Sequence, residues 1–552
     1  MLAGCIPWPD ELVDRYRREG FWTDEVLGDI LDPWLERDGS RPAIVTGSGA
    51  TTYAQLNGRV HQVAGALQRL GIRQGDRILV QLPNDVDLVA ISLASFRLGV
   101  MPVFALVAHR RHEIAYLCRH AEPSAYVIPG LYQGFDFRKL ADEVRAADPR
   151  PMHVISTGDP GSHLSLRALA DSGAASFPRI DPAEVAFFLL SGGTTGTPKL
   201  IPRTHRDYAF QLRATAQAVR VDSNSTYLAA LPVAHNAALG CPGALGTLRA
   251  GGKVVLAQNP SPGEIFPLIA REHVTLTTLM PSILKLWVEM AEPLAADLSG
   301  VLFQVGGAWL DPQVARKVYA ILGARLTHWF GMAEGFLSYT RLDDPQELAV
   351  RSTGRPLCTA DEIRVVDDAD QEVAPAGTGE LLVRGPTTLR GYYRAEDYNQ
   401  KTFTADGYLR TGDLVRIDDS GNMVMEGRIK DVVNRGGEKV PTEELEQYLT
   451  MHPGVEQAAV VAVPDPDMVE KTCAFVVAGR NAPVAAELRR FLRDSGLAGY
   501  KIPDLINFVD ALPHTNLGKV NKRALRERLT AQAAADAAAR EQPQAPARSR
   551  SP

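Results

Sequence analysis

The sequence predicts an α/β protein with a large N-terminal domain of α/β subdomains plus a β subdomain, followed by a small α+β C-terminal domain. At 552 residues the chain exceeds what one hydrophobic core usually holds. As far as about Arg351, short apolar segments alternate with segments of helical periodicity, a pattern that indicates a parallel sheet covered on both faces. Short β segments with many turns follow, and after Lys430 about a hundred residues have the length of a separate domain.

The N-terminal part is expected to begin with an aromatic arm, residues 6–22, that packs against a core. Residues 165–181 form a looser connection. Apolar residues at helical spacing predict helices at 53–70, 85–98, 111–120, 206–219, 265–272 and 282–290. Short apolar runs predict strands at 77–82, 101–106, 125–128, 185–190, 225–231, 253–256, 276–279, 302–305 and 325–330.

The β subdomain is expected to contain strands at 362–366, 379–384, 408–414 and 422–427. The C-terminal domain is expected to contain helices at 442–450 and 484–494 and strands at 457–463 and 472–477. The last residues are rich in Ala, Gln, Arg, Pro and Ser, a composition that favours disorder. The predicted organisation is therefore a large domain at 1–429, a small domain at 430–529 and a disordered tail at 530–552.

Composition excludes several classes of protein. Hydrophobic content of 45% and charged content of 22% are those of an ordinary globular protein, and a net charge of -6 provides no basic field for nucleic acid or an anionic membrane. The five cysteines are scattered without metal-ligand spacing, which fits a reducing compartment. Neither a signal peptide nor a run of roughly 18 apolar residues is visible, so a cytoplasmic location is expected.

The loop after the strand 185–190 has the chemistry of a phosphate-binding loop. It contains Ser191, Gly192, Gly193, Thr194, Thr195, Gly196 and, two residues later, Lys199. Glycines let the backbone fold tightly around an anion, and hydroxyl and amide groups donate to phosphate oxygens. The spacing is not that of a Walker loop, because Thr197 and Pro198 separate the last glycine from the lysine. Alone, the stretch is also compatible with a Gly/Thr surface turn, the less favoured of the two interpretations.

Four further stretches carry polar groups. They are Pro232 to Asn236 followed by Cys241, Phe330 to Glu334, Tyr408 to Asp413, and Leu512 to Lys519. Gly306, Gly307 and Gly331 follow short strands, and because ligands in open α/β sheets collect at strand ends, these glycines are candidate pocket walls. Each stretch is weak alone: a single His at a strand end is usually structural, and a single Asp in a turn usually caps it.

The order of these stretches resembles the acyl-adenylate-forming superfamily, from the N-terminal arm to about Leu525. Its aryl-acid branch, the 2,3-dihydroxybenzoate- and salicylate-AMP ligases, is matched at residues 190–196, 199–205, 234–236, 331–335 and 434–439. The resemblance implies that the protein joins a carboxylate to ATP, with Mg²⁺, to give acyl-AMP and pyrophosphate. The acyl group then passes to a pantetheine thiol.

The resemblance also implies roles for individual residues. Ser191 to Lys199 would hold the β- and γ-phosphates, and Glu334 would ligate Mg²⁺. Phe330 would stack on adenine, with Gly307 and Gly331 beside it, while Asp413 would bind the ribose with help from Arg428. Lys519 would stabilise charge between the attacking carboxylate and the α-phosphate; read alone, it is a solvated loop lysine. The C-terminal domain is mobile in this family; its hinge would fall on Lys430, and Gly436 would line the pantetheine tunnel.

The acyl pocket would contain His235, a candidate catalytic residue, with Asn236, Ala237, Gly240, Cys241, Gly306 and Leu337. Asn236 would bond the acid's carboxylate and ortho-hydroxyl, which favours a 2-hydroxyaryl acid. Cys241 and Leu337 are the pair found with salicylate rather than 2,3-dihydroxybenzoate, because an apolar lining leaves a 3-hydroxyl unpaired.

Ala237 departs from the branch, where an aromatic residue is usual, and Ser338 replaces a common Asn. A larger pocket would suit a bulkier analogue such as 3-hydroxyquinaldate or 3-hydroxypicolinate, unless Phe336 or Trp309 fills the space. Salicylate and a bulkier acid both stay open.

Two other functions are weighed against this one. A coenzyme A ligase would use the same first step, and a non-catalytic binding protein would not need Glu334, Asp413 and Lys519 together. No carrier domain follows Lys519 in the sequence, so an aryl carrier protein acting in trans is the expected partner, with a small aromatic acid as substrate.

Overall fold

The structure is a computed structural model that describes residues 1–541 except 149, 171–174, 192–197, 309, 368, 436–437, 466–467, 496, 498 and 516–518. The chain divides into two compact units. Unit 1 consists of Met1–Thr411 and Arg416–Val424, and unit 2 of Gly412–Val415 and Met425–Pro552. The predicted boundary at 429/430 lies shortly after Met425, where the second segment of unit 2 begins.

A nine-stranded sheet forms one half of unit 1. Its six central strands are parallel, as expected from the strand–helix alternation, and antiparallel strands flank them at both edges. In spatial order the strands are β18 (Arg355–Pro356), β17 (Leu337–Tyr339), β16 (Arg325–Gly331), β15 (Leu302–Gly306), β14 (Leu276–Leu279), β12 (Thr226–Ala229), β13 (Lys253–Leu256), β1 (Pro42–Thr46) and β2 (Gly49–Thr52).

A separate seven-stranded sheet forms the other half, so the parallel sheet expected from the sequence is in fact two sheets. Its strands are β11 (Leu200–Thr204), β10 (Val185–Leu190), β4 (Met101–Phe104), β3 (Arg77–Val80), β5 (Ala125–Ile128), β8 (His153–Ser156) and β9 (Leu164–Ser165). Only β11 is antiparallel to its neighbour. A small hairpin of β6 (Leu131–Tyr132) and β7 (Phe135–Asp136) lies outside both sheets.

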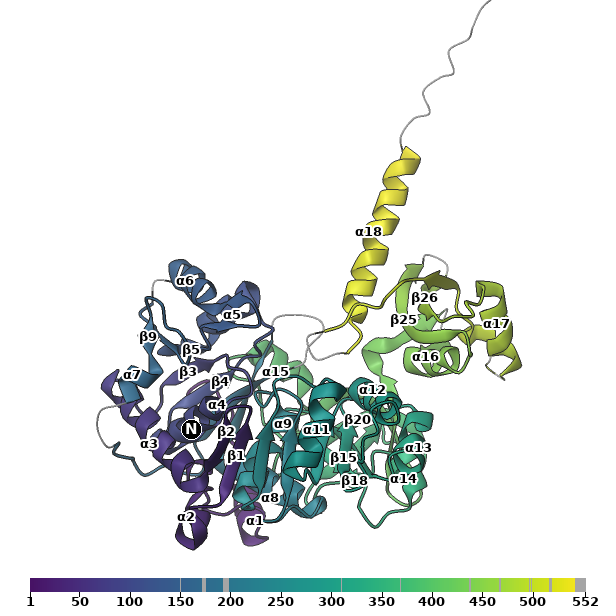
Figure 1. Cartoon of the computed structure of the whole chain (residues 1–552). Coiled ribbons are helices and arrows are strands. Elements are labelled where there is room, and N and C mark those ends of the chain that lie inside the picture. The colour runs from purple at the N-terminus through teal and green to yellow at the C-terminus, as the bar shows by residue number, and fades with distance from the viewer. Residues whose placement is uncertain are drawn as a thin grey trace, which may run out of the picture. The chain divides into compact units, whose positions relative to one another are not determined.

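Helices cover both sheets, and their starts follow capping residues in the sequence. Thr52 and Gln55 form a capping box at the start of α3, and Asp85 caps α4. Helices α5 and α6 lie together beside β3 and β5 (Figure 1). The helices of unit 1 are α1 (Asp10–Arg18), η1 (Leu27–Asp29), α2 (Asp32–Asp38), α3 (Tyr53–Arg69), α4 (Val86–Leu98), α5 (Arg111–Ala121), α6 (Phe137–Ala147), α7 (Leu166–Ala170), α8 (His205–Ala218), α9 (Asn236–Gly240), α10 (Gly243–Arg249), α11 (Pro262–Glu272), α12 (Pro281–Ala291), α13 (Pro312–Ala320), α14 (Gln346–Arg351) and α15 (Glu396–Thr402).

The N-terminal arm packs against a core, as the sequence indicates. Trp8, Tyr16 and Trp22 are buried and pack with Phe210 of α8. The rings of Tyr16 and Trp22 meet edge to face with centroids 4.9 Å apart, a favoured aromatic geometry. The arm therefore completes the hydrophobic packing around α8, which also carries residues of the candidate site described below.

The β subdomain is a four-stranded sheet in the order β19 (Glu362–Val366), β20 (Thr378–Arg384), β21 (Leu409–Ile417) and β22 (Met423–Arg428). These strands lie close to their predicted ranges. The division between the two units falls within β21 and β22.

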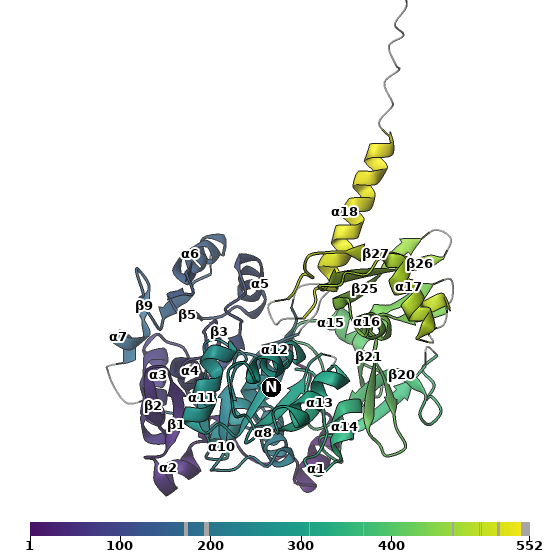
Figure 2. The same ribbon diagram turned by 45° about the vertical axis from the view of Figure 1, so that its right-hand side comes forward.

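Unit 2 is built on a sheet whose long strands are buried on both faces. Along β25 (Val455–Asp465), Val460 contributes to one hydrophobic core and Val461 to another. This explains the uninterrupted apolar run at 458–463. Helix α16 packs on β25, and α17 contributes to the same core as Val460 (Figure 2). The other elements are η2 (Ile429–Asp431), β23 (Val432–Arg435), β24 (Glu438–Pro441), α16 (Thr442–Thr450), β26 (Val469–Ala478), α17 (Ala485–Asp494), η3 (Gly499–Lys501), β27 (Leu505–Phe508) and α18 (Lys522–Glu541).

The predicted tail begins too early. Helix α18 extends to Glu541, so residues 530–541 continue a helix instead of forming a disordered segment. This stretch is rich in alanine, the strongest helix former, and composition alone did not separate it from the residues that follow.

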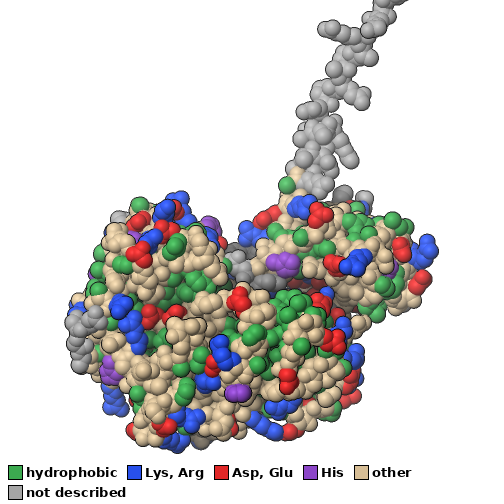
Figure 3. All heavy atoms as spheres, viewed as in Figure 1, with side chains coloured by type: hydrophobic (Ala, Val, Ile, Leu, Met, Phe, Trp, Pro, Cys, Tyr) green, Lys and Arg blue, Asp and Glu red, His purple; other side chains and the backbone are tan. Residues whose placement is uncertain are grey.

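The described helices do not include one with the length and apolar character needed to cross a membrane. On the face of the molecule in Figure 3, acidic and basic side chains are interspersed. This agrees with the modest net charge of -6.

Candidate active site

The glycine-rich loop connects two antiparallel strands, β10 and β11, at an edge of the seven-stranded sheet. Its ends are tied together at Ser191 and Lys199: the Ser191 amide donates to the Lys199 carbonyl at 3.0 Å, and the Lys199 amide donates to Ser191 Oγ at 3.0 Å. Gly192, Gly193, Thr194, Thr195 and Gly196 lie outside the described residues. The two ends of the predicted phosphate loop are therefore hydrogen-bonded to each other.

Lys199 and Glu334 interact electrostatically in a setting that contains two tyrosines. Lys199 Nζ lies 3.7 Å from the ring centroid of Tyr398, and Glu334 Oε1 accepts a hydrogen bond from the Tyr392 hydroxyl at 2.8 Å. Burial lowers the pKa of Lys199, while the charge of Glu334 acts in the opposite direction. Burial raises the pKa of Tyr392, and the Glu334 charge raises it further. Neither tyrosine was predicted from the sequence to belong to the site.

The carboxyl ends of β15 and β16 bring together three predicted pocket glycines, because parallel neighbours end at the same edge. A Cβ on Gly306 would lie 2.2 Å from the Trp329 carbonyl oxygen, and one on Gly331 would lie 2.2 Å from Leu337 Cδ2. Gly307 has φ +79°, a conformation that side chains rarely adopt, and lies beside Met280. The structure therefore requires glycine at these strand ends.

Phe330, the predicted adenine-stacking residue, is half-buried at the end of β16. Its ring centroid lies 6.2 Å from that of Phe336, which is fully buried. The β16–β17 hairpin pairs Gly331 with Leu337 and Phe330 with Ser338, which explains why the predicted adenine and acid residues lie close together. Trp309, the other aromatic residue considered for the acyl pocket, lies outside the described residues.

The sequence suggested that His235 directly follows a strand, but β12 already ends at Ala229. His235 caps the short helix α9 instead, with Nδ1 accepting from the Ala237 amide at 3.3 Å. In a neutral ring with this bond, the proton is on Nε2. Ala237 is 2% exposed, and Gly240 and Cys241 are also buried.

Asn236 is 6% exposed and lies among buried polar groups. Its Oδ1 accepts from the Tyr208 hydroxyl at 2.9 Å and faces Gln211 Nε2 at 3.4 Å. Gln211 Nε2 also donates to the Gly240 carbonyl at 2.9 Å and lies 3.5 Å from Cys241 Sγ. Burial raises the pKa of Cys241 to about 12, so its thiol stays protonated.

Arg203 joins this group to the Glu334 loop. Its Nη2 donates to Gln211 Oε1 at 2.9 Å, its Nη1 donates to the Ala333 carbonyl at 3.1 Å, and its Nε donates to Asp207 Oδ1 at 2.9 Å. Arg203, Asp207 and Gln211 are fully buried. These three residues and Tyr208 were not predicted from the sequence, although Asp207 and Gln211, four positions apart within the predicted helix 206–219, were a usable signal for a polar face on it.

In unit 2, two predicted nucleotide-binding residues contact each other. Arg428 Nε lies 2.7 Å from Asp413 Oδ1, and Asp413 is 2% exposed. The Asp413 charge raises the pKa of Arg428 further above its usual range. Asp413 lies within strand β21 and not in a tight turn; the preceding Gly412 has φ +70°.

The remaining predicted residues also belong to unit 2. Lys519 is exposed, and its backbone pairs with Thr515, whose Oγ1 accepts from the Lys519 amide at 3.2 Å. Lys430 lies in the short helix η2. Gly436 lies outside the described residues, between β23 and β24.

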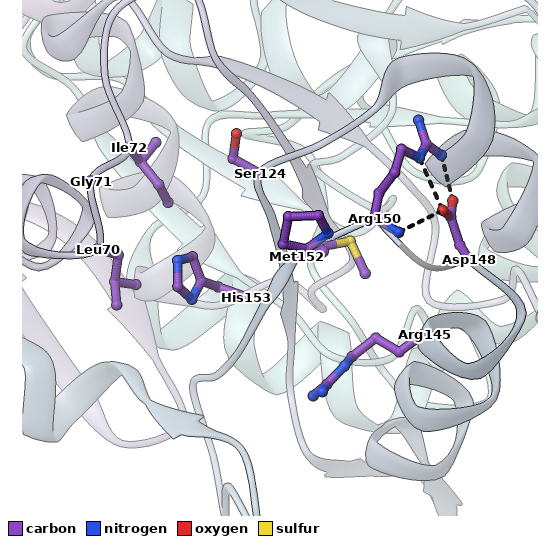
Figure 4. Close-up of a pocket in the computed structure, with 10 residues that line it drawn as sticks. Leu70, Gly71, Ile72, Ser124, Arg145, Asp148, Arg150, Met152 and His153 are labelled. Atoms are coloured by element: carbon purple, nitrogen blue, oxygen red, sulfur yellow. Dashed lines mark hydrogen bonds and ion pairs between the residues drawn. The ribbon is translucent and has the colours of Figure 1, made fainter.

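A hollow on the surface of unit 1 lies away from these residues. A surface cavity of about 570 Å³ is lined by Leu70, Ile72, Arg145, Arg150 and His153, among others (Figure 4). None of the predicted site residues lines it. Three hydrogen bonds, from the backbone amide, Nε and Nη2 of Arg150, hold it against the Asp148 carboxylate, so part of the basic character of the lining is neutralised within the protein.

The topology of unit 1 and the groups gathered at its sheet edges are those of an adenylate-forming enzyme. Residues 31–393 match the AMP-binding enzyme family, and residues 444–519 match the AMP-binding enzyme C-terminal domain. The chain belongs to the AMP-binding enzyme family, whose members generally use ATP and Mg²⁺.

Three similar proteins cover nearly the whole chain. A 2,3-dihydroxybenzoate-AMP ligase of Bacillus subtilis is 48% identical over 531 residues, 96% of this chain and 98% of its own. A salicylyl-CoA synthase / salicylate adenylyltransferase of a Streptomyces species is 45% identical over 539 residues, 95% of this chain and 97% of its own. The apo structure of MbtA from Mycobacterium smegmatis is 40% identical, with a TM-score of 0.74, and the match covers 95% of this chain and 99% of that one.

Proposed function

We propose that the protein adenylates a 2-hydroxyaryl carboxylic acid with ATP, releases pyrophosphate, and passes the aryl group to the phosphopantetheine thiol of a separate aryl carrier protein. The observation that carries this proposal is the buried Asn236 amide, held by Tyr208 and Gln211 next to Cys241. An amide so placed can bond a carboxylate and its ortho substituent. The names of two relatives, which act on 2,3-dihydroxybenzoate and salicylate, support the same substrate class.

The residues around Glu334 fit a nucleotide with a bound Mg²⁺. The ion prefers oxygen ligands and usually takes one or two carboxylates together with phosphate oxygens. Glu334 supplies one such carboxylate between β16 and β17, and the phosphate oxygens of a bound nucleotide would supply the other ligands. In this proposal Glu334 holds Mg²⁺, and the ion neutralises phosphate charge when bound. Ser191 and Lys199, with the loop between them, bind the departing pyrophosphate.

The other assignments complete the proposed site. Phe330 stacks on adenine, with Gly307 and Gly331 beside it. Asp413 accepts hydrogen bonds from the ribose hydroxyls, and its contact with Arg428 at 2.7 Å holds the carboxylate in place. Lys519 stabilises the charge that develops between the acid and the α-phosphate. In this scheme the C-terminal domain turns about Lys430 for the second step, and Gly436 leaves room for pantetheine.

The identity of the acid depends on the space beside Ala237. Ala237 is 2% exposed and Phe336 is fully buried, so both side chains are already covered by protein atoms. The Cys241 thiol is protonated, and with Leu337 it supplies little for a 3-hydroxyl to bond. Salicylate and bulkier analogues, 3-hydroxyquinaldate or 3-hydroxypicolinate, are the proposed candidates. Siderophore or peptide-antibiotic assembly is the proposed setting, in the cytoplasm.

ATP–pyrophosphate exchange tests this proposal directly. Benzoate, salicylate, 2,3-dihydroxybenzoate, 3-hydroxypicolinate and 3-hydroxyquinaldate should be compared side by side. We expect exchange with at least one 2-hydroxyaryl acid to exceed that with benzoate by about tenfold or more, the worth of one buried hydrogen bond to the ortho group. Equal exchange with benzoate, or none with any acid, would contradict the assignment.

A coenzyme A ligase is the second candidate, because one relative's name includes salicylyl-CoA synthase. The first step is the same in both cases, so only the thiol acceptor distinguishes them. Thioester formation should be measured with free coenzyme A and with a phosphopantetheinylated aryl carrier protein. Comparable rates at equal thiol concentration would favour the second candidate.

A further inference from the structure

A chain of buried polar groups ends at Asn236, and each link has a defined donor and acceptor. Arg203 donates to Asp207 and, through Nη2, to Gln211 Oε1 at 2.9 Å. Gln211 then presents Nε2 to the Gly240 carbonyl at 2.9 Å and to Asn236 Oδ1 at 3.4 Å. All of these side chains are at least nine-tenths buried, so water cannot substitute for a missing partner.

Arg203 fixes which atoms donate and which accept along this series of hydrogen bonds. A guanidinium group can only donate hydrogen bonds, so the Gln211 atom that faces it must be the amide oxygen. The other end of the Gln211 amide is therefore an NH₂ group. One N–H of that group donates to the Gly240 carbonyl at 2.9 Å. The other favours an oxygen on Asn236, since an Asn236 NH₂ group at 3.4 Å could not accept a hydrogen bond from it. The Tyr208 hydroxyl, which can donate or accept, adapts by donating to the same oxygen.

The consequence is that Asn236 has its oxygen engaged and its NH₂ group available. Among the residues that the structure describes, Asn236 Nδ2 has no hydrogen-bond partner, although the side chain is only 6% exposed. A buried donor without a partner in the protein is suited to an acceptor on a ligand. It cannot serve a ligand group that itself donates.

We propose that Gln211, oriented by Arg203, is a positioning residue that fixes Asn236 as a hydrogen-bond donor, so that the site selects aryl acids whose ortho substituent accepts a hydrogen bond. This inference rests on the proposed aryl-acid function and adds a rule for the ortho group. It also assigns the selectivity to Arg203 on β11 and Gln211 on α8, which act on the ortho group through Asn236.

Salicylate and anthranilate distinguish the two orientations of the Asn236 amide. The salicylate hydroxyl donates to its own carboxylate, which leaves oxygen lone pairs that accept from Asn236. The anthranilate amino group also donates to its carboxylate, but its second N–H points outward and its lone pair is delocalised into the ring. A donor at Asn236 therefore suits salicylate and opposes anthranilate, whose ring is otherwise of the same size.

The test is pyrophosphate exchange with salicylate and anthranilate as alternative substrates, in the wild-type protein and in Gln211→Met. We expect the wild-type kcat/KM to be at least about tenfold higher for salicylate. Methionine matches glutamine in length but neither donates nor accepts strongly, so Asn236 can turn over. The salicylate-to-anthranilate ratio should then fall by about tenfold, mainly through KM. Gln211→Met combined with Tyr208→Phe should bring the ratio close to one.

Thr247→Val is the matched control. Thr247 is fully buried, and its hydroxyl bonds only within α10, to the Gly243 carbonyl at 2.7 Å, so the substitution removes a buried hydrogen bond without touching Asn236. It should leave the substrate ratio unchanged. A proportional loss of both activities in Gln211→Met would show a purely structural role and overturn the inference.

The wild-type measurement alone also tests the inference, should the variants fail to fold. Equal activation of salicylate and anthranilate, or a preference for anthranilate, would overturn the inference and leave aryl-acid adenylation standing. Activation of no aryl acid at all would overturn both.

Discussion

Gly240→Ala should damage the acid site by moving Tyr208, and the structure gives the size of the effect. An added Cβ would lie 2.3 Å from the Tyr208 hydroxyl oxygen and 2.5 Å from Cζ, and Tyr208 is completely buried. Relief of this overlap costs about 1–3 kcal/mol. If the ring shifts, its 2.9 Å hydrogen bond to Asn236 is lost, which costs about 1–3 kcal/mol more.

Two measurements check this prediction. In calorimetry the transition of the large domain should fall by several degrees, and in pyrophosphate exchange the KM for the preferred aryl acid should rise by about tenfold or more. The KM for ATP should change little. Gly58→Ala is the control: Gly58 lies within helix α3 with nothing within 4 Å of an added Cβ, so alanine should stabilise by up to about 1 kcal/mol. An unchanged transition and KM in Gly240→Ala would refute the position assigned to Tyr208.

Three further predictions concern other parts of the chain. Lys519→Ala should abolish pyrophosphate exchange without changing the circular dichroism spectrum, because Lys519 is exposed; near-wild-type exchange would remove it from the reaction. Gly436→Leu should spare exchange and block thioester formation on the carrier protein, and equal loss of both would count against a tunnel. Burial lowers the pKa of His205 to about 3, so the unfolded chain binds a proton below about pH 6.5 that the folded protein does not. The stability that neutral His205 contributes is therefore present above pH 6.5 and lost as the pH falls toward 3, and His205→Gln should flatten the fall in unfolding temperature between pH 6.5 and 4.5.

Strands in the middle of a sheet were the easiest elements to predict. Ala125–Ile128 and Val185–Leu190 have the predicted bounds because every residue is apolar and many are β-branched or aromatic. Strand β11 was missed because Leu200–Thr204 contains Pro202 and Arg203, which interrupt an apolar run. Proline is tolerated there because β11 is an edge strand that pairs only with β10. Such an exception depends on sheet position, which a single sequence does not contain.

In the candidate site, too, some residues could be predicted from the sequence and others could not. Glu334, Asp413, Arg428 and the ends of the glycine-rich loop could be named from the sequence because the order of their stretches resembles that of a known family, and their roles stay predictions. The partners Tyr392 and Gln211 were not predicted, because each is distant in sequence from the site residue that it contacts. Tyr392, which precedes α15, donates a hydrogen bond to Glu334, and Gln211 of α8 contacts Asn236. Contacts of this kind form only when the chain folds.

The substrate preference proposed for the acyl site therefore has two physical origins with different limits. Cys241 and Leu337 act through shape, and a difference of one methylene in an apolar pocket discriminates by only about 10- to 200-fold. Asn236 acts through the direction of a hydrogen bond, which a buried guanidinium imposes two contacts away. Repacking around Cys241 would alter which ring fits but would leave the requirement for an accepting ortho group. A change at Gln211 or Arg203 would relax that requirement, and this separates the two origins by experiment.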